Sequence, residues 1–228
     1  MNRLRTYFTP FERALWLSSA GLIVLSAVLF RGGGALSVLT SLIGVTSLIF
    51  AAKGNPISQA LMIVFSLLYG WISWTFSYYG EMITYLGMTM PMAAWSLIAW
   101  LRHPFDGSRA QVAVNRLKAG EIAFLAVFTT AVTVGFYFIL RACHTANLLP
   151  STLSVATSFA AAYLTARRSA WFALAYAMND LVLIVLWLLA SLADTSYFTV
   201  LVCFAVFFVN DLYGFLSWLN MRKRQKTA

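Results

Sequence analysis

Two asparagine–aspartate pairs, Asn179-Asp180 and Asn210-Asp211, are the residues of this sequence best suited to binding chemistry. Both pairs lie deep within long apolar segments, 169–192 and 197–220. An ionised side chain at the centre of a bilayer costs about 2.5–3.5 kcal/mol, so such residues usually face a cavity or a partner. Amides and carboxylates bind hydroxyl groups, and a carboxylate also attracts a cation. The pairs therefore predict a binding site for a small polar solute.

Aromatic side chains share helix faces with both pairs. Helical spacing places Tyr176 and Trp187 on the face of Asp180. In the following segment, the residues that share a face are Asn210, Tyr213, Gly214 and Ser217. The ring of a solute stacks on Trp or Tyr, its hydroxyls bond to Asn and Asp, and a cationic ring is attracted to an indole face. These faces predict a hydroxylated solute with an aromatic ring.

A second interpretation of these residues is structural. Asn, Ser and Thr side chains join membrane helices through hydrogen bonds, and Trp and Tyr form belts at the membrane surfaces. A belt explains the tryptophans near segment ends at least as well as a site does: Trp16, Trp95, Trp100 and Trp171. Trp71, Trp74 and Trp187 are intermediate. Because the two Asn-Asp pairs lie so deep, we favour a binding site for them.

The composition requires a membrane to position these residues. Of the 228 residues, 61% are hydrophobic and 10% are charged, and the mean hydropathy is +0.79. Soluble domains carry about a quarter charged residues, and disordered chains have low hydrophobicity, so both classes are excluded. We expect an all-α membrane protein. Runs of about 20 apolar residues predict eight transmembrane helices: 13–30, 35–52, 57–79, 82–101, 121–140, 149–166, 169–192 and 197–220.

The basic residues predict the orientation of these helices. Sixteen Lys and Arg against seven Asp and Glu give a net charge of +9. Eight spans place all of the basic residues except Arg31 and Arg141 on the side of both termini. The positive-inside rule puts that side in the cytoplasm, so the charge records orientation and predicts no nucleic-acid partner. The longer connection, 102–120, is then cytoplasmic, and we expect 111–117 to lie on the membrane surface.

Short matches indicate that a three-helix unit is used twice. Residues 36–41 match 153–158, and Trp100 corresponds to Trp218. Three helices reverse the chain's direction, so a linker helix must separate two parallel units, as in SWEET transporters, whose substrate site lies near the midplane. The predicted divisions are 1–33 (cytoplasmic N-terminus and extra helix), 34–102 (first unit), 103–145 (cytoplasmic loop and linker helix), 146–220 (second unit) and 221–228 (basic cytoplasmic tail).

The sequence lacks the patterns of an enzyme or a metal site. His103 and His144 fall on opposite sides of the predicted membrane, and Cys143 and Cys203 are far apart without a partner motif. No nucleophile elbow, phosphate-binding loop or paired-carboxylate motif appears. We therefore expect no catalytic residue, no metal and no cofactor.

With these features, the chain resembles the PnuC-type vitamin and nucleoside transporters, whose best-known members carry nicotinamide riboside. The resemblance covers most of the chain. Its strongest segments are Ala175-Tyr176-Ala177 followed by Asn179-Asp180 with Trp187, and Asn210-Asp211-x-Tyr213-Gly214-x3-Trp218. Further matches are the Tyr78-Tyr79-Gly80-Glu81 turn, the loop residues Val112, Val114, Asn115 and Arg116, and the run from Ser151 to Ala162.

The resemblance implies a SWEET-like homotrimer in a bacterial inner (plasma) membrane. It implies uptake of nicotinamide riboside for NAD biosynthesis by facilitated diffusion, made one-way when a cytoplasmic nucleoside kinase phosphorylates the solute. Thiamine, riboflavin and deoxynucleosides are the alternative substrates. The pocket would be lined by residues that match Trp71, Trp74, Asp180, Trp187, Asn210 and Tyr213. This chain departs from the enterobacterial pattern because both late helices carry Asn-Asp pairs.

Residue pattern and resemblance together predict one substrate-binding set: Trp71, Trp74, Tyr176, Asn179, Asp180, Trp187, Asn210, Asp211, Tyr213 and Ser217. Two other functions stay open. One is a membrane scaffold whose polar groups only pack helices, and the other is a proton-coupled carrier that uses Asp180 or Asp211 as a relay. The sequence offers no chain of carboxylates or histidines between the two membrane faces, which makes proton coupling the weakest of the three functions.

Overall fold

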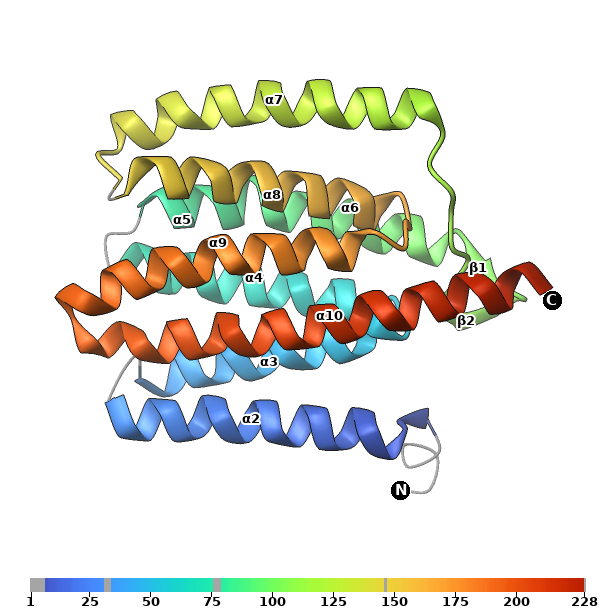
Figure 1. Ribbon diagram of the computed structural model, residues 1–228, viewed down its shortest axis with the longest axis horizontal. Coiled ribbons are helices and arrows are strands. Elements are labelled where there is room, and N and C mark those ends of the chain that lie inside the picture. The colour runs from blue at the N-terminus through green and yellow to red at the C-terminus, as the bar shows by residue number, and fades with distance from the viewer. Residues whose placement is uncertain (1–6, 31–33, 76–78, 146, 228) are drawn as a thin grey trace.

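Nearly all of the described chain is helical in the computed structural model, which describes residues 7–30, 34–75, 79–145 and 147–227 (Figure 1). Within these residues, eight helices are long and apolar enough to cross a membrane. This number confirms the prediction of an all-α membrane protein with eight spans. The spans are α2 (Pro10–Phe30), α3 (Gly34–Ala52), α4 (Ile57–Thr75), the segment Gly80–Leu101, α7 (Ala119–Ala142), α8 (Leu148–Ala166), α9 (Phe172–Ala193) and α10 (Phe198–Thr227).

The helices run alongside one another, so the molecule has two ends (Figure 1). The terminal end holds the start of α2 and the end of α10, and the far end holds the α7–α8 connection and the short helix η2 (Thr195–Tyr197). Every described Lys and Arg except Arg141 lies toward the terminal end. Arg3, Arg5 and Arg31 lie outside the described residues, as do Tyr78 and the side chain of Tyr79 from the resemblance.

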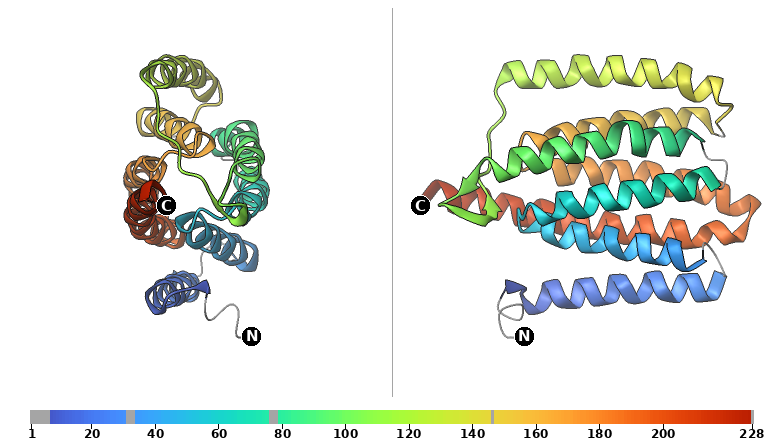
Figure 2. Two further views of the ribbon diagram at one scale, coloured as in Figure 1. Left: turned by 90° about the vertical axis from the view of Figure 1, so that its right-hand side faces the viewer. Right: turned by 180° about the vertical axis from the view of Figure 1, so that it is seen from behind.

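Contacts between helices close a ring in the order α3, α4, α6 (Met90–Leu101), α8, α9, α10 and back to α3. Helix α2 packs on α3 and α10, and α7 packs on α8, both outside the ring (Figure 2, left). The first helix of each predicted unit thus contacts the third helix of the other. A two-fold axis that relates the two units requires these two contacts to be equivalent. The repeat itself and the five sequence divisions stay predictions.

The fourth span is not the continuous α-helix that 82–101 predicted. It consists of α5 (Tyr79–Thr84), a π-helical turn η1 (Tyr85–Thr89) and α6. Pro91 follows the turn, and proline lacks an N–H and clashes with the carbonyl four residues earlier. The backbone relieves this clash by widening, since Met90 N–H donates to the Tyr85 carbonyl, five residues back. Such turns are frequent at functional sites.

A β-hairpin joins this span to α7 at the terminal end. Strands β1 (Pro104–Phe105) and β2 (Ser108–Val112) pair through Asp106 and Gly107, which both have positive φ, as a two-residue type I′ turn requires. Val112 is fully buried, and its N–H donates to the Gly54 carbonyl at 2.9 Å. The expectation that 111–117 lies on the membrane surface was therefore wrong for Val112, which packs against protein.

Candidate functional site

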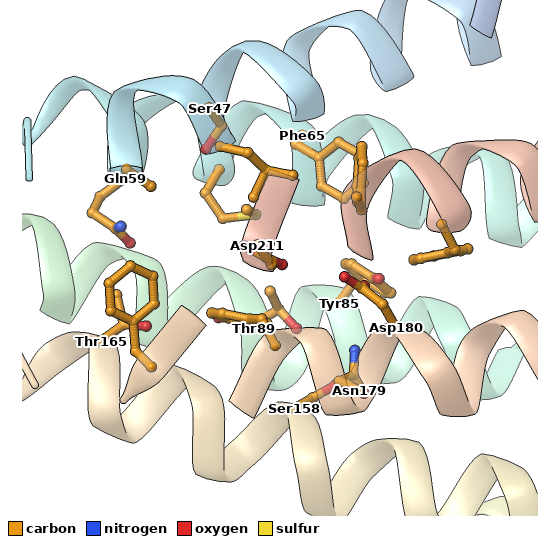
Figure 3. A pocket seen from close by; sticks show the side chains of 17 residues that line it. Ser47, Gln59, Phe65, Tyr85, Thr89, Ser158, Thr165, Asn179, Asp180 and Asp211 are labelled. Atoms are coloured by element: carbon orange, nitrogen blue, oxygen red, sulfur yellow. Dashed lines mark hydrogen bonds between the residues drawn. The ribbon is translucent and has the colours of Figure 1, made fainter. Parts of the chain in front are cut away.

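A cavity of about 60 Å³ lies inside the ring, between one row of helices, α3, α4 and α6, and a second row, α8, α9 and α10 (Figure 3). Each span of the ring contributes to its wall, the fourth span through the π-turn. Its polar lining residues are Ser47, Gln59, Tyr85, Thr89, Ser158, Thr165, Tyr176, Asn179, Asp180 and Asp211. The open space holds a few water molecules, whereas pockets for small organic ligands measure about 300–1,000 Å³. The structure thus shows this site closed.

Two acidic side chains point into the cavity from neighbouring helices (Figure 3). Asp180 on α9 and Asp211 on α10 are 3% and 5% exposed, and their carboxyl groups lie next to each other. Among the described residues, no Lys or Arg lines the cavity, and Asp180 Oδ2 is buried without a hydrogen-bond partner. Two carboxyl groups so close are stable in a low-dielectric site only when a proton or a cation offsets their repulsion. This arrangement suits a cationic ligand.

Asn179 presents a hydrogen-bond donor beside the acids. Its Oδ1 accepts hydrogen bonds from Thr157 Oγ1 at 2.8 Å and from Ser158 Oγ at 2.9 Å, both on α8. The two hydroxyls fix the amide so that its nitrogen points toward the acids (Figure 3). An oriented NH₂ group donates to a carbonyl or hydroxyl oxygen of a ligand. The cavity therefore combines a donor with paired carboxyl groups.

Aromatic rings close the cavity around these polar groups. Phe65 lies on its far-end side, 5.9 Å from the rings of both Tyr85 and Phe207, and Tyr176 and Phe172 line it as well. A flat heteroaromatic ligand can stack on such rings or pack against them edge to face. Admitting such a ligand requires these rings to move, because the closed space is too small.

A tryptophan pair, Trp100 and Trp218, packs behind the terminal end of the cavity, against the lining residue Phe172. Their ring centroids lie 5.4 Å apart, and Trp218 is fully buried against Phe172 of the cavity wall. Trp100 Nε1 donates to the Thr165 carbonyl at 2.8 Å, and Trp218 Nε1 donates to the Ala51 carbonyl at 2.7 Å. Each tryptophan thus ties the third helix of one predicted unit to the first helix of the other.

The structure brings four of the sequence-predicted residues together in the cavity: Tyr176, Asn179, Asp180 and Asp211. Trp187 lies on the same face of α9, about two turns closer to the far end. It is buried in the core with Leu183 and Phe204, and its ring centroid lies 5.7 Å from that of Tyr197. Trp187 therefore stands between the cavity and the far end.

Three other predicted residues face away from the cavity. Asn210 Nδ2 donates to Ser19 Oγ at 3.0 Å, and Tyr213 OH donates to Glu12 Oε1 at 2.9 Å, both on α2. Ser217 Oγ donates to the Ala52 carbonyl of α3 at 2.7 Å. The three residues share a face of α10, as helical spacing predicted, but that face holds α2 and α3. The structure does not bring them to the cavity.

Trp71 and Trp74 also lie away from the cavity. Both are on the last turns of α4, they are 54% and 50% exposed, and their ring centroids are 5.1 Å apart. Of the two interpretations, their exposure fits a belt at the membrane surface better than a wall of this cavity.

Several polar residues of the cavity were not predicted from the sequence: Ser47, Gln59, Tyr85, Thr89, Ser158 and Thr165. Pro91 was the available signal for Tyr85 and Thr89, because a proline inside an apolar span distorts the turn before it. Gln59, a long amide in an apolar span, was the other signal. Among the described residues, no group of His, Cys, Asp and Glu could hold a metal ion.

A Tyr213→Phe change tests whether the outer face of α10 serves stability or binding. The tyrosine donates to Glu12, which also pairs with Lys53 Nζ at 3.1 Å. Hydrogen bonds to charged groups contribute up to about 3 kcal/mol, so we expect a lower unfolding temperature in detergent. We expect an unchanged KM for uptake, because the side chain does not line the cavity. Tyr137→Phe on α7 is the matched control, and a raised KM at unchanged stability would place Tyr213 in the substrate path.

Comparisons with known proteins agree with one another. The family model described as "Nicotinamide mononucleotide transporter" matches residues 34–220. The nicotinamide riboside transporter PnuC of Neisseria mucosa is 25% identical over 222 residues, which are 95% of this chain and 84% of that one. The protein of the same name from Haemophilus influenzae is 23% identical over 217 residues, which are 94% and 92% of the two chains.

A solved structure has the same fold. The crystal structure of the vitamin B3 transporter PnuC superposes with a TM-score of 0.81 at 21% identity, and the match covers 96% of this chain and 94% of that one. Because the family model spans the helices of the ring and most of the chain, this multi-pass membrane protein belongs to the nicotinamide mononucleotide transporter family, whose members are PnuC-type transporters and not enzymes.

Proposed function

We propose that this protein carries nicotinamide riboside through the cavity between the two rows of helices. The observation that carries the proposal is the Asp180–Asp211 pair beside the oriented amide of Asn179, in a cavity with aromatic walls. Nicotinamide riboside joins a cationic pyridinium ring to a carboxamide and a ribose, so its groups match the carboxyl pair, the amide donor and the rings. The names of both relatives support this substrate.

Each residue has a role in this proposal. Asp180 and Asp211 offset the positive charge of the ring, and Asn179 Nδ2 donates to the carboxamide oxygen. Tyr176 packs against the ring, and Trp187 separates the site from the far end. Trp71, Trp74, Asn210, Tyr213 and Ser217 have no part in the proposed site, because they do not line the cavity.

The proposed transport mode is facilitated diffusion, with the solute trapped when a cytoplasmic kinase phosphorylates it. Within the described residues, the wall of the central cavity holds no acid besides Asp180 and Asp211 and no histidine, which supports a carrier without an ion gradient. The basic residues at the terminal end support a cytoplasmic position for both termini in a bacterial plasma membrane.

The proposed assembly is a homotrimer. The outer helix α7 buries only Leu140 among its described residues, and it exposes a row of large apolar side chains that includes Ile122, Val127 and Phe138. Such a face packs equally well against lipid, so chemical cross-linking in membranes is the test: trimeric species support the proposal, and a monomer alone contradicts it.

Uptake into proteoliposomes tests the proposed function. We expect saturable uptake of labelled nicotinamide riboside that equilibrates across the membrane, competes with unlabelled compound and is unaffected by an uncoupler. Saturable uptake of thiamine, riboflavin or a deoxynucleoside instead would replace the substrate. Loss of uptake on adding an uncoupler would favour the proton-coupled carrier, which the contact between Asp180 and Asp211 makes the second candidate. No transport and no ligand-dependent thermal shift would favour a scaffold.

A further inference from the structure

A second and larger cavity lies at the far end, with a volume of about 520 Å³. We call it the far-end vestibule; its polar and aromatic walls come from Glu81 on α5, Ser151 on α8, Trp187 on α9, and Asp194 and Tyr197 at η2. Its volume is in the range of pockets that hold small organic molecules. Trp187 forms its boundary toward the central cavity, because the same side chain belongs to the core around that cavity.

Two acidic side chains, Glu81 and Asp194, line the vestibule. Asp194 Oδ1 accepts a hydrogen bond from Ser196 N–H at 2.8 Å, and this bond lowers the pKa of the exposed Asp194 carboxyl, which therefore stays ionised at neutral pH. The ion pairs among the described residues are formed by Glu12 and by Glu121. Neither Glu81 nor Asp194 takes part in an ion pair within that part of the chain. Among the described lining residues, no Lys or Arg balances these two acids.

An aromatic pair stands beside these acids. The ring centroids of Trp187 and Tyr197 lie 5.7 Å apart at an interplanar angle of 48°. An indole or phenol face next to carboxylates attracts a flat cation through both its charge and its ring. The vestibule thus repeats the chemistry of the central cavity, acids beside aromatic rings, in a space that is open in this structure.

We propose that the far-end vestibule is a second binding site, which holds a cationic heteroaromatic nucleoside before it enters the central cavity. The ring lies against Trp187 and Tyr197, and its charge lies near Glu81 and Asp194. This inference rests on the proposed function because it assigns the same solute to both sites. Solute bound here reaches the central cavity only when Trp187 and the rings behind it move.

The test combines Glu81→Gln with Asp194→Asn in the full protein and measures uptake of labelled nicotinamide riboside into proteoliposomes. We expect KM to rise about threefold to tenfold, as for the loss of a partly exposed ionic contact, with little change in the maximal rate. We also expect the KM of the wild type, but not of the variant, to rise with ionic strength. Asp106→Asn in the hairpin at the opposite end is the matched control.

Direct binding separates this inference from the proposed function. With Asp180→Asn weakening the central site, we expect the protein to retain weak, salt-sensitive binding of labelled nicotinamide riboside in equilibrium dialysis. Adding Glu81→Gln and Asp194→Asn should abolish that binding. One outcome refutes the second site and leaves the proposed function intact. In that outcome the wild type transports the riboside, and the two vestibule changes alter neither the KM for uptake, nor the dependence of KM on salt, nor the binding that remains in Asp180→Asn. If the wild type transports none but vestibule-dependent binding remains, the proposed function fails and the second site stands.

Discussion

Replacement of Asp180 or Asp211 by asparagine is expected to weaken the binding of nicotinamide riboside by about 10- to 150-fold. Each change keeps the shape of the side chain and removes one carboxyl group from a pair that lines the closed cavity. A hydrogen bond to a charged group contributes about 1.5–3 kcal/mol, which corresponds to that range of affinity. Loss of both carboxyl groups should abolish saturable uptake. Competition binding to purified protein and initial rates in proteoliposomes measure the two effects.

A change on the opposite face of α10 is the control for these variants. Ser217→Ala removes a hydroxyl that binds the Ala52 carbonyl and not the cavity, so we expect its affinity for the riboside to stay unchanged. Asn210→Ala likewise should lower stability through the lost contact with Ser19 and not affinity. If both aspartate variants retain the wild-type KM and rate, the acids only pack helices and the proposed site is wrong.

Truncation of Trp218 to alanine is expected to destabilise the protein by about 3–5 kcal/mol, as for other fully buried aromatic residues. The side chain is 0% exposed, and it contacts Trp100 and Phe172 at ring-centroid distances of 5.4 and 4.8 Å. Its loss also removes the hydrogen bond from α10 to the carbonyl of Ala51, another lining residue of the cavity. We therefore expect a lower unfolding temperature and faster leakage, from preloaded proteoliposomes, of a small solute that the protein does not carry.

A milder change at Trp218 and a control at an exposed tryptophan accompany this test. Trp218→Phe keeps a six-membered ring and loses the Nε1 donor with the rest of the indole, so we expect a smaller loss of about 1–3 kcal/mol. Trp74→Ala, at a tryptophan that is 50% exposed, should change stability little. Wild-type stability and wild-type leakage in Trp218→Ala would show that the tryptophan pair does not support the terminal end of the cavity.

The eight spans were predictable because each one depends on a local property, about 20 apolar residues between polar ends. The π-turn at Tyr85–Thr89 was not predicted. Pro91 has no backbone N–H to donate, and only the structure shows that the helix accommodates it by a wider turn before the proline. The hairpin was missed although Asp106-Gly107 is a strong turn signal between short strands. The burial of its second strand could not be predicted locally, because Val112 of that strand is held by a hydrogen bond to the carbonyl of Gly54, far away in the sequence.

The candidate site was predictable in part. The depth of Asp180 and Asp211 in apolar sequence pointed to a cavity, and both acids do line one. Their neighbours Asn179 and Asn210 differ: the first lies in the cavity and the second faces α2. Successive helical residues point about 100° apart, so sequence alone could not decide which face of α10 an additional helix would cover.

The remaining cavity residues come from helices far apart in the sequence. Gln59, Thr89 and Ser158 reach the same space only because the ring of helices closes. No local pattern encodes that closure. Trp71 and Trp74 were implied by the resemblance and not by their spacing, and the structure leaves both outside the cavity.

A structure determined with bound nicotinamide riboside tests most directly whether the cavity between the two rows is the substrate site. We predict ligand density in contact with Asn179, Asp180 and Asp211, with the surrounding rings displaced to make room. An empty central cavity, with the ligand between Trp71 and Trp74 or against Tyr213, would contradict the assignment.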